Sequence, residues 1–311
     1  MSVKWFDACF SSEEGAPVIR YKNTPEGHLE FVREVRSRAK SAHICMEHTG
    51  GYETALAIAC IEAKFTVSVV DGAKVATYRK SFGSAKAKTD KADARLLAKF
   101  CKDRKPARWF PFPTDYQVLR ELVKHREDLV EERKRLSCQA SHRVQNEFVS
   151  ASRKAMLQVV LLQIKAVSKE ILAHVKASPA LKKAVELLTS ISGIAFVSAV
   201  RILAEAGPVS NYSSAKDYAL NAGLIPIPCQ SGQKTPPGKL PVYGNKSLRC
   251  AFYFPALTCL GKTTGIGAFM ARIERNGRKS KMTVIVAGMR KLAYVVFGVL
   301  KNQTKFDEKL T

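Results

Sequence analysis

The chain has 311 residues, of which 46% are hydrophobic and 25% are charged. This length allows two or more domains and the apolar content is enough for real cores, so disorder is not the default expectation. Lysine and arginine number 51 against 27 acidic residues, which gives a net charge of +24. Because the basic residues are spread along the sequence, we expect a large folded surface for nucleic acid, with a generic bias of surface charge as the alternative.

The cysteines and the apolar stretches of the sequence indicate where in the cell the protein is located. The eight cysteines form no CxxC pair, so we expect reduced, buried thiols in a cytoplasmic protein rather than disulfides or a zinc site. The opening MSVKWFDACF lacks the pattern of a secretory signal. Arg290 and Lys291 interrupt the most apolar late stretch, 282–300, so we expect no membrane-spanning segment.

The first third predicts strands that alternate with helices. Thr24 is a candidate N-cap, with Pro25 at the first helical position. The alternation predicts a mixed α/β layer with a mainly parallel sheet after an opening hairpin. Glu47 would end a central strand, where open α/β sheets place their chemistry. The predicted strands are 4–10, 18–22, 41–47 and 65–71, and the predicted helices are 25–39 and 52–65.

The stretch 86–100, KAKTDKADARLLAKF, puts two acids into basic surroundings. Its apolar pattern predicts a helix that starts near Thr89, with Asp90 and Asp93 on one face about one turn apart. Two hard oxygen ligands at that separation can share Mg²⁺ or Mn²⁺. In the alternative interpretation, Thr89 caps the helix and the acids only complement its dipole.

The middle of the chain predicts two long helices. Residues 116–148 carry dense charge without Gly or Pro, and a second helical pattern covers 154–177. Helices of this length with a short connector indicate an antiparallel hairpin or coiled coil, which serves either as a dimer element or as a spacer.

From Pro179 the sequence predicts a mainly α domain. The turn SISG, which ends in Gly193, is typical of a helix-hairpin-helix whose backbone amides approach a phosphate, although other tight helical turns look similar. A further helix precedes a loop at 226–245 that is rich in Pro, Gly and Lys, and three helices follow this loop.

Two groups of residues could carry chemistry. Glu47, Asp90 and Asp93 could converge beside a sheet, as in RNase H-like nucleases, where two metal ions activate the attacking oxygen and stabilise the leaving one. Asp7 is the nearest candidate for a fourth acid. Ser231 could act as a nucleophile on a phosphate whose charge is offset by nearby cations, although most loop serines are structural. The residues around this serine are Gly232, Lys234, Lys239, Lys246 and Arg249.

Several motifs, in order, resemble the DEDD-type insertion-sequence transposases, the family named insertion sequence one-ten. The resemblance runs from about Trp5 to Phe306. Its marks are CMEHTGGYETALA around Glu47, KTDKADARLLA around Asp90 and Asp93, SISGIAFVSAVRILAEAG, and AGLIPIPCQSG followed by GNKSLRCAFYFPAL.

The resemblance implies a RuvC-like domain of RNase H fold over 1–113, a coiled-coil linker over 114–178 and a C-terminal transposase domain over 179–311. It implies that Glu47, Asp90 and Asp93 are the second to fourth acids and bind Mg²⁺ or Mn²⁺, and that Ser231 attacks DNA covalently. It also implies DNA partners at the element ends and the target and a structured guide RNA, and we expect a homo-oligomer. Nucleic-acid contacts are expected at Gly193, Gly232, Lys234, Lys239, Lys246 and Arg249.

Two departures from the family pattern stand out. Members usually begin with a strand of the form GIDVSK, whose Asp is the first acid, whereas this sequence starts just before KWFDACF. We therefore expect a truncation, either a start assigned too late or a decayed copy without one metal ligand, and we do not expect Asp7 to substitute. His48 stands where a small residue is usual and would oppose a metal at Glu47 only if protonated, so we expect an inert loop residue.

The leading hypothesis is therefore a transposase that cleaves and rejoins DNA through metal-bound acids and Ser231. One alternative is a noncatalytic nucleic-acid-binding remnant that keeps the basic surface. Another is a junction-resolving nuclease that uses only the acids.

Overall fold

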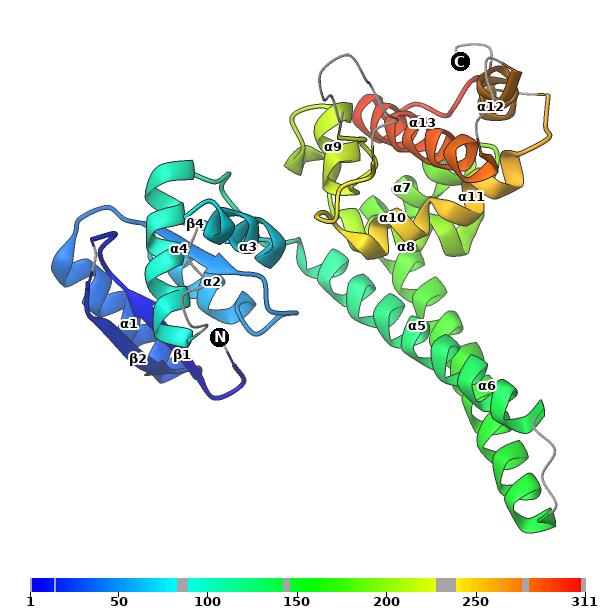
Figure 1. Ribbon diagram of the computed structural model, residues 1–311. Helices are drawn as coiled ribbons and strands as arrows, with labels where there is room; N and C mark the ends of the chain where they lie inside the picture. Colours follow the sequence, from blue (N-terminus) through cyan, green and yellow to red (C-terminus); the bar gives the residue numbers. More distant parts are fainter. Residues whose placement is uncertain are drawn as a thin grey trace. The chain divides into compact units, whose positions relative to one another are not determined.

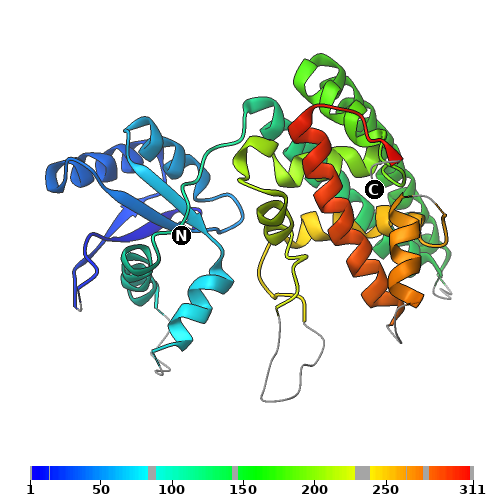
Figure 2. The same ribbon diagram turned by 90° about the horizontal axis from the view of Figure 1, so that it is seen from above.

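The computed structural model describes residues 2–13, 15–82, 89–141, 146–227, 239–263, 265–275 and 280–308. The chain forms two compact units, Met1–Pro111 and Phe112–Thr311. The first unit mixes strands and helices, and the second is helical (Figures 1 and 2). The predicted combination of an α/β part with a mainly α part is thus confirmed, while the three-part division with a separate linker stays a prediction.

The first unit contains two separate two-stranded sheets in its described part. β1 (Trp5–Cys9) pairs with β2 (Val18–Lys22) in antiparallel fashion, and β3 (His43–Glu47) pairs with β4 (Thr66–Val70) in parallel. Parallel pairing after the opening hairpin is therefore confirmed, although among the described residues this sheet has only two strands and no backbone pairing joins β1 to β3. The first unit's helices are α1 (Pro25–Arg38), α2 (Thr54–Glu62), α3 (Gly72–Lys80) and α4 (Asp90–Arg104).

Helix starts in this unit follow local capping chemistry. The side chain of Thr24 accepts a hydrogen bond from the Gly27 amide at 3.3 Å, and Thr89 accepts one from Ala92 at 3.2 Å. Both predicted N-caps are confirmed. α3 was not predicted, because GAKVATYRK begins with Gly and contains two β-branched residues, which are poor helix formers. It begins where the carboxylate of Asp71 accepts a hydrogen bond from the Ala73 amide at 2.8 Å.

The second unit begins with the two long helices that the sequence predicts. α5 (Thr114–Ser141) and α6 (Glu147–Ala177) run side by side as a hairpin (Figure 1). Their ends nearest the rest of the unit contribute Leu119 and Ile171 to its hydrophobic core. The remaining elements are α7 (Pro179–Thr189), α8 (Phe196–Ala206), the 3₁₀ helix η1 (Val209–Asn211), α9 (Ala215–Asn221), α10 (Lys246–Ala251), α11 (Tyr253–Cys259), α12 (Gly265–Arg275) and α13 (Lys281–Asn302).

One predicted helix is split in two. The segment 246–260 forms α10 and α11, which meet at Phe252. Pro255 has no amide hydrogen to donate to the carbonyl of Ala251, so a continuous helix would lose that bond.

α13 is long and apolar enough to cross a membrane by length and composition, but 56% of its most apolar window is buried inside the protein. Leu292, Ala293 and Val296 on this helix are fully buried in the core of the second unit. This burial is the pattern of a central core helix.

The cysteines differ in part from the expectation of burial. The seven described cysteines are free thiols, but Cys138 and Cys250 are exposed because they lie on solvent-facing sides of α5 and α10. The eighth, Cys229, lies outside the described residues.

Candidate active site

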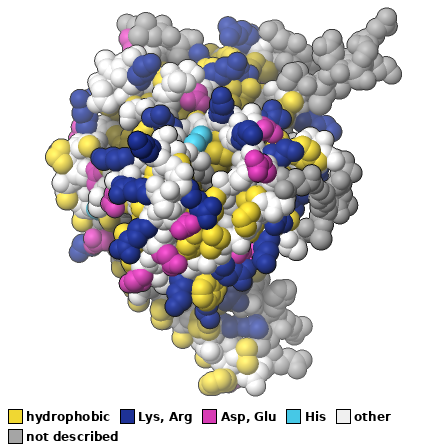
Figure 3. All heavy atoms as spheres, turned by 90° about the vertical axis from the view of Figure 1, so that its left-hand side faces the viewer, with side chains coloured by type: hydrophobic (Ala, Val, Ile, Leu, Met, Phe, Trp, Pro, Cys, Tyr) yellow, Lys and Arg dark blue, Asp and Glu magenta, His cyan; other side chains and the backbone are white. Residues whose placement is uncertain are grey.

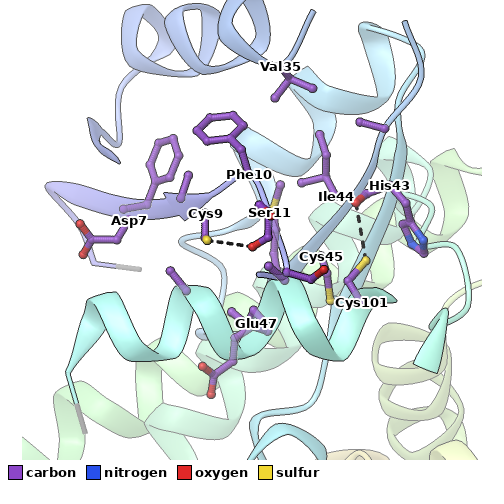
Figure 4. A pocket seen from close by; sticks show the side chains of 18 of the residues that line it. Asp7, Cys9, Phe10, Ser11, Val35, His43, Ile44, Cys45, Glu47 and Cys101 are labelled. Atoms are coloured by element: carbon purple, nitrogen blue, oxygen red, sulfur yellow. Dashed lines mark hydrogen bonds between the residues drawn. The ribbon is translucent and has the colours of Figure 1, made fainter. Parts of the chain in front are cut away.

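Four carboxylates of the first unit line one cavity of about 590 Å³. Glu47 ends β3, Asp90 and Asp93 occupy the first turn of α4, and Asp7 lies in β1. Figure 4 shows Asp7 and Glu47 among the side chains around this cavity. Glu47, Asp90 and Asp93 thus line one space, although they lie far apart in the sequence.

The side chain of Glu47 lies over the start of α3. A Cβ atom built on Gly72 would stand 2.3 Å from the Oε1 atom of Glu47, so the glycine leaves the space that this carboxylate fills. Gly72 is the first residue of α3, and the positive end of the helix dipole favours a negative charge there. The carboxylate therefore has a defined position at the carboxyl end of β3.

Arginine side chains form ion pairs with the other three acids. Arg20 donates two hydrogen bonds of 2.9 Å to the two carboxylate oxygens of Asp7, and its Nη2 atom lies 3.8 Å from the Oδ2 atom of Asp90. Arg79 of α3 forms an ion pair with Asp93. The side chain of Asp7 is only 8% exposed, so its bidentate partner compensates a buried charge.

The donor chemistry of this cavity suits a hard divalent cation, since carboxylate oxygens are the ligands that Mg²⁺ and Mn²⁺ prefer. The positions of the side chains do not suit such an ion. Among the described residues, no three acidic, histidine or cysteine side chains stand close enough together to hold one. Guanidinium groups contact three of the four carboxylates instead. Ion binding here would require the acidic side chains to move.

Glu53 organises the loop that follows Glu47, and the sequence analysis missed it. One oxygen of its buried carboxylate lies 2.6 Å from the Nδ1 atom of His48. The other accepts hydrogen bonds from the amide and the hydroxyl of Thr49 and from the amide of Gly51. His48 is therefore not the inert loop residue that we expected. A glutamate near a TGG turn was the available signal, because such a turn presents free amides.

Glu53→Gln is expected to destabilise the protein in a pH-dependent way. Burial alone raises the pKa of Glu53, but the hydrogen bonds from His48 and Thr49 outweigh it and lower the pKa from 4.5 to about 2. The stabilisation is therefore complete above pH 4.5 and is lost as the pH falls toward 2. Urea unfolding at pH 7 should show a loss of about 1 to 2 kcal/mol, allowing for solvent screening.

The matched control for this substitution is Glu62→Gln, which changes an exposed acid at the end of the adjacent helix α2. Its unfolding free energy should change by less than about 0.5 kcal/mol at either pH. An equal loss at pH 7 and pH 3 for Glu53→Gln would contradict the assigned role of its charge.

In the second unit, the predicted site residues Ser231, Gly232 and Lys234 lie outside the described residues. The base of their loop is described. The amide of Ile227 donates to the carbonyl of Lys239 at 2.9 Å, which joins the two sides of the loop. A backbone bridge between these two described residues therefore closes the base of the loop.

Arg249 holds the same loop base from α10. Its guanidinium donates to the carbonyls of Ala222, Pro241 and Tyr243 at 3.1 to 3.3 Å. Gly223 leaves room for it, since a Cβ atom there would stand 2.1 Å from Nη2. In this structure the guanidinium of Arg249 thus contacts protein carbonyls and joins α10 to the described residues at the base of the loop.

Among the described residues near this loop, Lys239 and Lys246 are exposed cations. Lys246 is the first residue of α10, whose N-cap Asn245 accepts a hydrogen bond from the Leu248 amide at 2.9 Å. On the face of the molecule in Figure 3, Lys and Arg side chains are scattered widely and outnumber the acidic ones. The basic surface thus extends well beyond these two lysines.

Gly193 lies in the turn between α7 and α8 with a φ of +92°, which favours glycine. A Cβ atom at this position would stand 2.7 Å from Cys259 Sγ and 2.8 Å from the Pro255 carbonyl oxygen. Close packing on α11 therefore explains the glycine itself. The N-terminus of α8 has no side-chain cap, so the amides of its first turn are the groups that could meet a phosphate.

Comparisons with known proteins cover both units. A family model described as "Transposase" matches residues 2–149, and one described as "Transposase IS116/IS110/IS902 family" matches residues 185–271. Pilin gene-inverting proteins of Moraxella lacunata and Moraxella bovis are 29% identical over 98% of this chain and 95% of their own length. An uncharacterized 43.6 kDa protein of insertion element IS110 from Streptomyces coelicolor is 23% identical over 53% of this chain and 39% of its own.

Proposed function

The chain belongs to the IS110 family of transposases, and from that membership we propose that it cleaves and rejoins DNA with two sets of residues, the acids of its first unit and Ser231 of its second. It is an enzyme that acts on DNA. The observation that carries the proposal is the order of the two matched segments, since the first contains Glu47, Asp90 and Asp93 and the second spans Ser231.

The acids support the first half of this mechanism. Glu47, Asp90 and Asp93 line one cavity and have the ligand chemistry for Mg²⁺ or Mn²⁺. A divalent cation bound there would supply charge stabilisation to phosphodiester cleavage. In the proposal the first unit has an RNase H or RuvC-like fold, and Asp90 and Asp93 would have to leave Arg20 and Arg79 before they could hold a cation.

Ser231 carries the second half. Its hydroxyl oxygen would attack a backbone phosphorus and displace one DNA oxygen, which leaves the DNA joined to the serine. Lys239 and Lys246 would offset the charge on the phosphate. The proposed site also includes Gly232 and Lys234 from the loop, the turn at Gly193, and Arg249 at the base of the loop.

The proposed binding partners are inferred from the net charge and from exposed apolar residues. A net charge of +24 suits binding to the element ends and the target DNA, and equally to a structured guide RNA. On α6, Met156, Val159 and Leu162 are 49%, 58% and 64% exposed, and they recur at intervals of three residues. We assign this side of the α5–α6 hairpin to contacts in a homo-oligomer.

A second candidate function is the inversion of a DNA segment. The relatives whose name describes inversion of a pilin gene align with 98% of this chain. Inversion, like transposition, requires DNA strands to be cut and rejoined, so the proposed residues could serve either reaction.

The test is an assay on two labelled DNA substrates, with Mg²⁺ or with a chelator. One carries the two ends of the element beside a target, and the other carries two sites in inverted orientation. Insertion products support transposition, and inversion products support the second candidate. Binding without strand cleavage on either substrate, with and without added element RNA, would contradict both and indicate a noncatalytic nucleic-acid-binding protein.

A further inference from the structure

Two cysteines of the first unit place their thiols against each other. Cys45 lies in the middle of β3, and Cys101 lies near the C-terminal end of α4. Their side chains form a hydrogen bond with each other, and the thiol of Cys101 also donates to the carbonyl of His43 at 3.5 Å (Figure 4). Two thiols in hydrogen-bond contact need only a short further approach to reach the S–S bond length of about 2.05 Å.

The surroundings of this pair differ from those of the other cysteines. Cys45 and Cys101 both line the cavity of about 590 Å³ that the carboxylates also line, so a small polar molecule in this cavity can reach them. Cys9 lines the same cavity, but its thiol donates to the carbonyl of Ser11 at 3.1 Å. Cys138 and Cys250 are exposed on helices of the second unit. Among the described cysteines, Cys45 and Cys101 are therefore the two that are poised to react with each other.

The two cysteines belong to the two elements that carry the acids of the candidate site. Glu47 follows Cys45 by two residues, so both side chains lie on the same face of β3. Asp93 precedes Cys101 on α4 by about 12 Å along the helix axis, at about 1.5 Å per residue. A covalent link between Cys45 and Cys101 would join β3 to α4 and restrict the movement of Asp93 relative to Glu47. Such movement is what ion binding requires in this cavity.

We propose that Cys45 and Cys101 form a disulfide when a hydroperoxide oxidises them, and that this disulfide slows DNA cleavage because it fixes α4 on β3. The effect on cleavage rests on the proposed function of the acids, whereas the formation of the disulfide does not. A dithiol reductant reverses the modification and returns both residues to free thiols.

The reaction consumes one hydroperoxide for each disulfide. One thiol loses its proton, and its sulfur attacks an oxygen of the peroxide, so that the O–O bond breaks and the leaving oxygen departs as water or an alcohol. The sulfur is now a sulfenic acid. The sulfur of the second cysteine attacks it, the S–O bond breaks, and the hydroxyl group leaves with the second proton as water. The two sulfurs together lose two electrons, which reduce the peroxide.

Hydrogen peroxide is the probe for the first measurement. The full chain is treated with it, the remaining thiols are alkylated, and the peptides are analysed by mass spectrometry without reduction. The linked peptides of Cys45 and Cys101 should exceed any pair that includes Cys138 or Cys250 at least about tenfold, because the first two thiols are already in contact. Cys9→Ser is the matched control, since it changes a thiol of the same cavity and should form the link at the normal rate.

Cleavage of labelled DNA with Mg²⁺ is the second measurement. The oxidised chain should cleave at least about tenfold more slowly than the reduced chain, and dithiothreitol should restore the rate. Cys101→Ser should cleave equally before and after treatment with peroxide. Cys45→Ser should behave in the same way, so the result does not depend on the folding of one variant.

Several outcomes would overturn the proposal. A link from Cys45 to Cys9, or oxidation that leaves Cys45 and Cys101 unlinked, would contradict the assigned pair. A disulfide that forms and leaves cleavage unchanged would contradict its effect on the site. If the reduced chain does not cleave DNA at all, the proposed function fails by itself. Mass spectrometry would then still decide whether the link forms, and slower amide exchange in α4 of the oxidised chain would show whether it fixes the helix.

Discussion

Ser231→Ala is expected to abolish the covalent adduct between protein and DNA and to lower recombination by about 10⁴-fold or more, because the attacking oxygen is removed. The measurement is gel separation of denatured protein from labelled DNA after incubation with Mg²⁺. Binding of the same DNA should stay within about threefold, since a serine hydroxyl adds little to an interface dominated by phosphate contacts.

Ser210→Ala is the matched control, because Ser210 is an exposed serine of the second unit in the short helix η1. It should form the adduct at the normal rate. A noncovalent complex that cleaves strands normally in Ser231→Ala would contradict the role of the serine. If that variant hydrolyses branched DNA normally and Asp90→Asn does not, the protein is a junction-resolving nuclease that uses only its acids.

Features of the candidate site that depend on neighbouring residues could be predicted from the sequence. Thr89 caps α4 because its side chain reaches an amide three residues ahead, and that spacing is visible in the sequence. Glu47 ends a strand because apolar residues precede it and a Gly-rich turn follows it. The division of 246–260 was equally accessible, since Pro255 breaks the helix for a local reason.

Features that depend on which distant segments pair or pack together could not be predicted in this way. Arg20 meets Asp7 only because the hairpin pairs these two positions directly, and it approaches Asp90 only because α4 packs beside β1. The partners of Arg249 are backbone carbonyls of two segments that converge at the loop base, and backbone acceptors leave no signature in the sequence.

Glu47→Gln and Asp90→Asn are each expected to lower Mg²⁺-dependent strand cleavage at least about a hundredfold, since loss of a direct ligand should cost no less than loss of an outer partner. Both changes keep the shape of the side chain and remove its charge. The measurement is the initial rate of cleavage over a series of Mg²⁺ concentrations. The control is Glu30→Gln, which neutralises an exposed acid of α1 and should leave the rate unchanged.

Gly72→Ala separates the position of Glu47 from its charge. The added methyl group would stand 2.3 Å from Glu47 Oε1, so the carboxylate must move while its charge remains. We expect cleavage to fall about tenfold or more, whereas the free energy of unfolding should change by no more than about 1 kcal/mol, because alanine favours the helix. Gly298→Ala in α13 is the control, since its Cβ atom would meet nothing within 4 Å.

The two kinds of variant together decide what the acidic cavity does. If charge at Glu47 matters only for stability, Glu47→Gln should unfold more easily and Gly72→Ala should cleave DNA normally. If the carboxylate is a ligand, both variants should fold and both should cleave slowly, and more Mg²⁺ should restore part of the activity of Gly72→Ala because its oxygen atoms remain. Normal cleavage by Glu47→Gln would remove this residue from the site, whatever the result at Gly72.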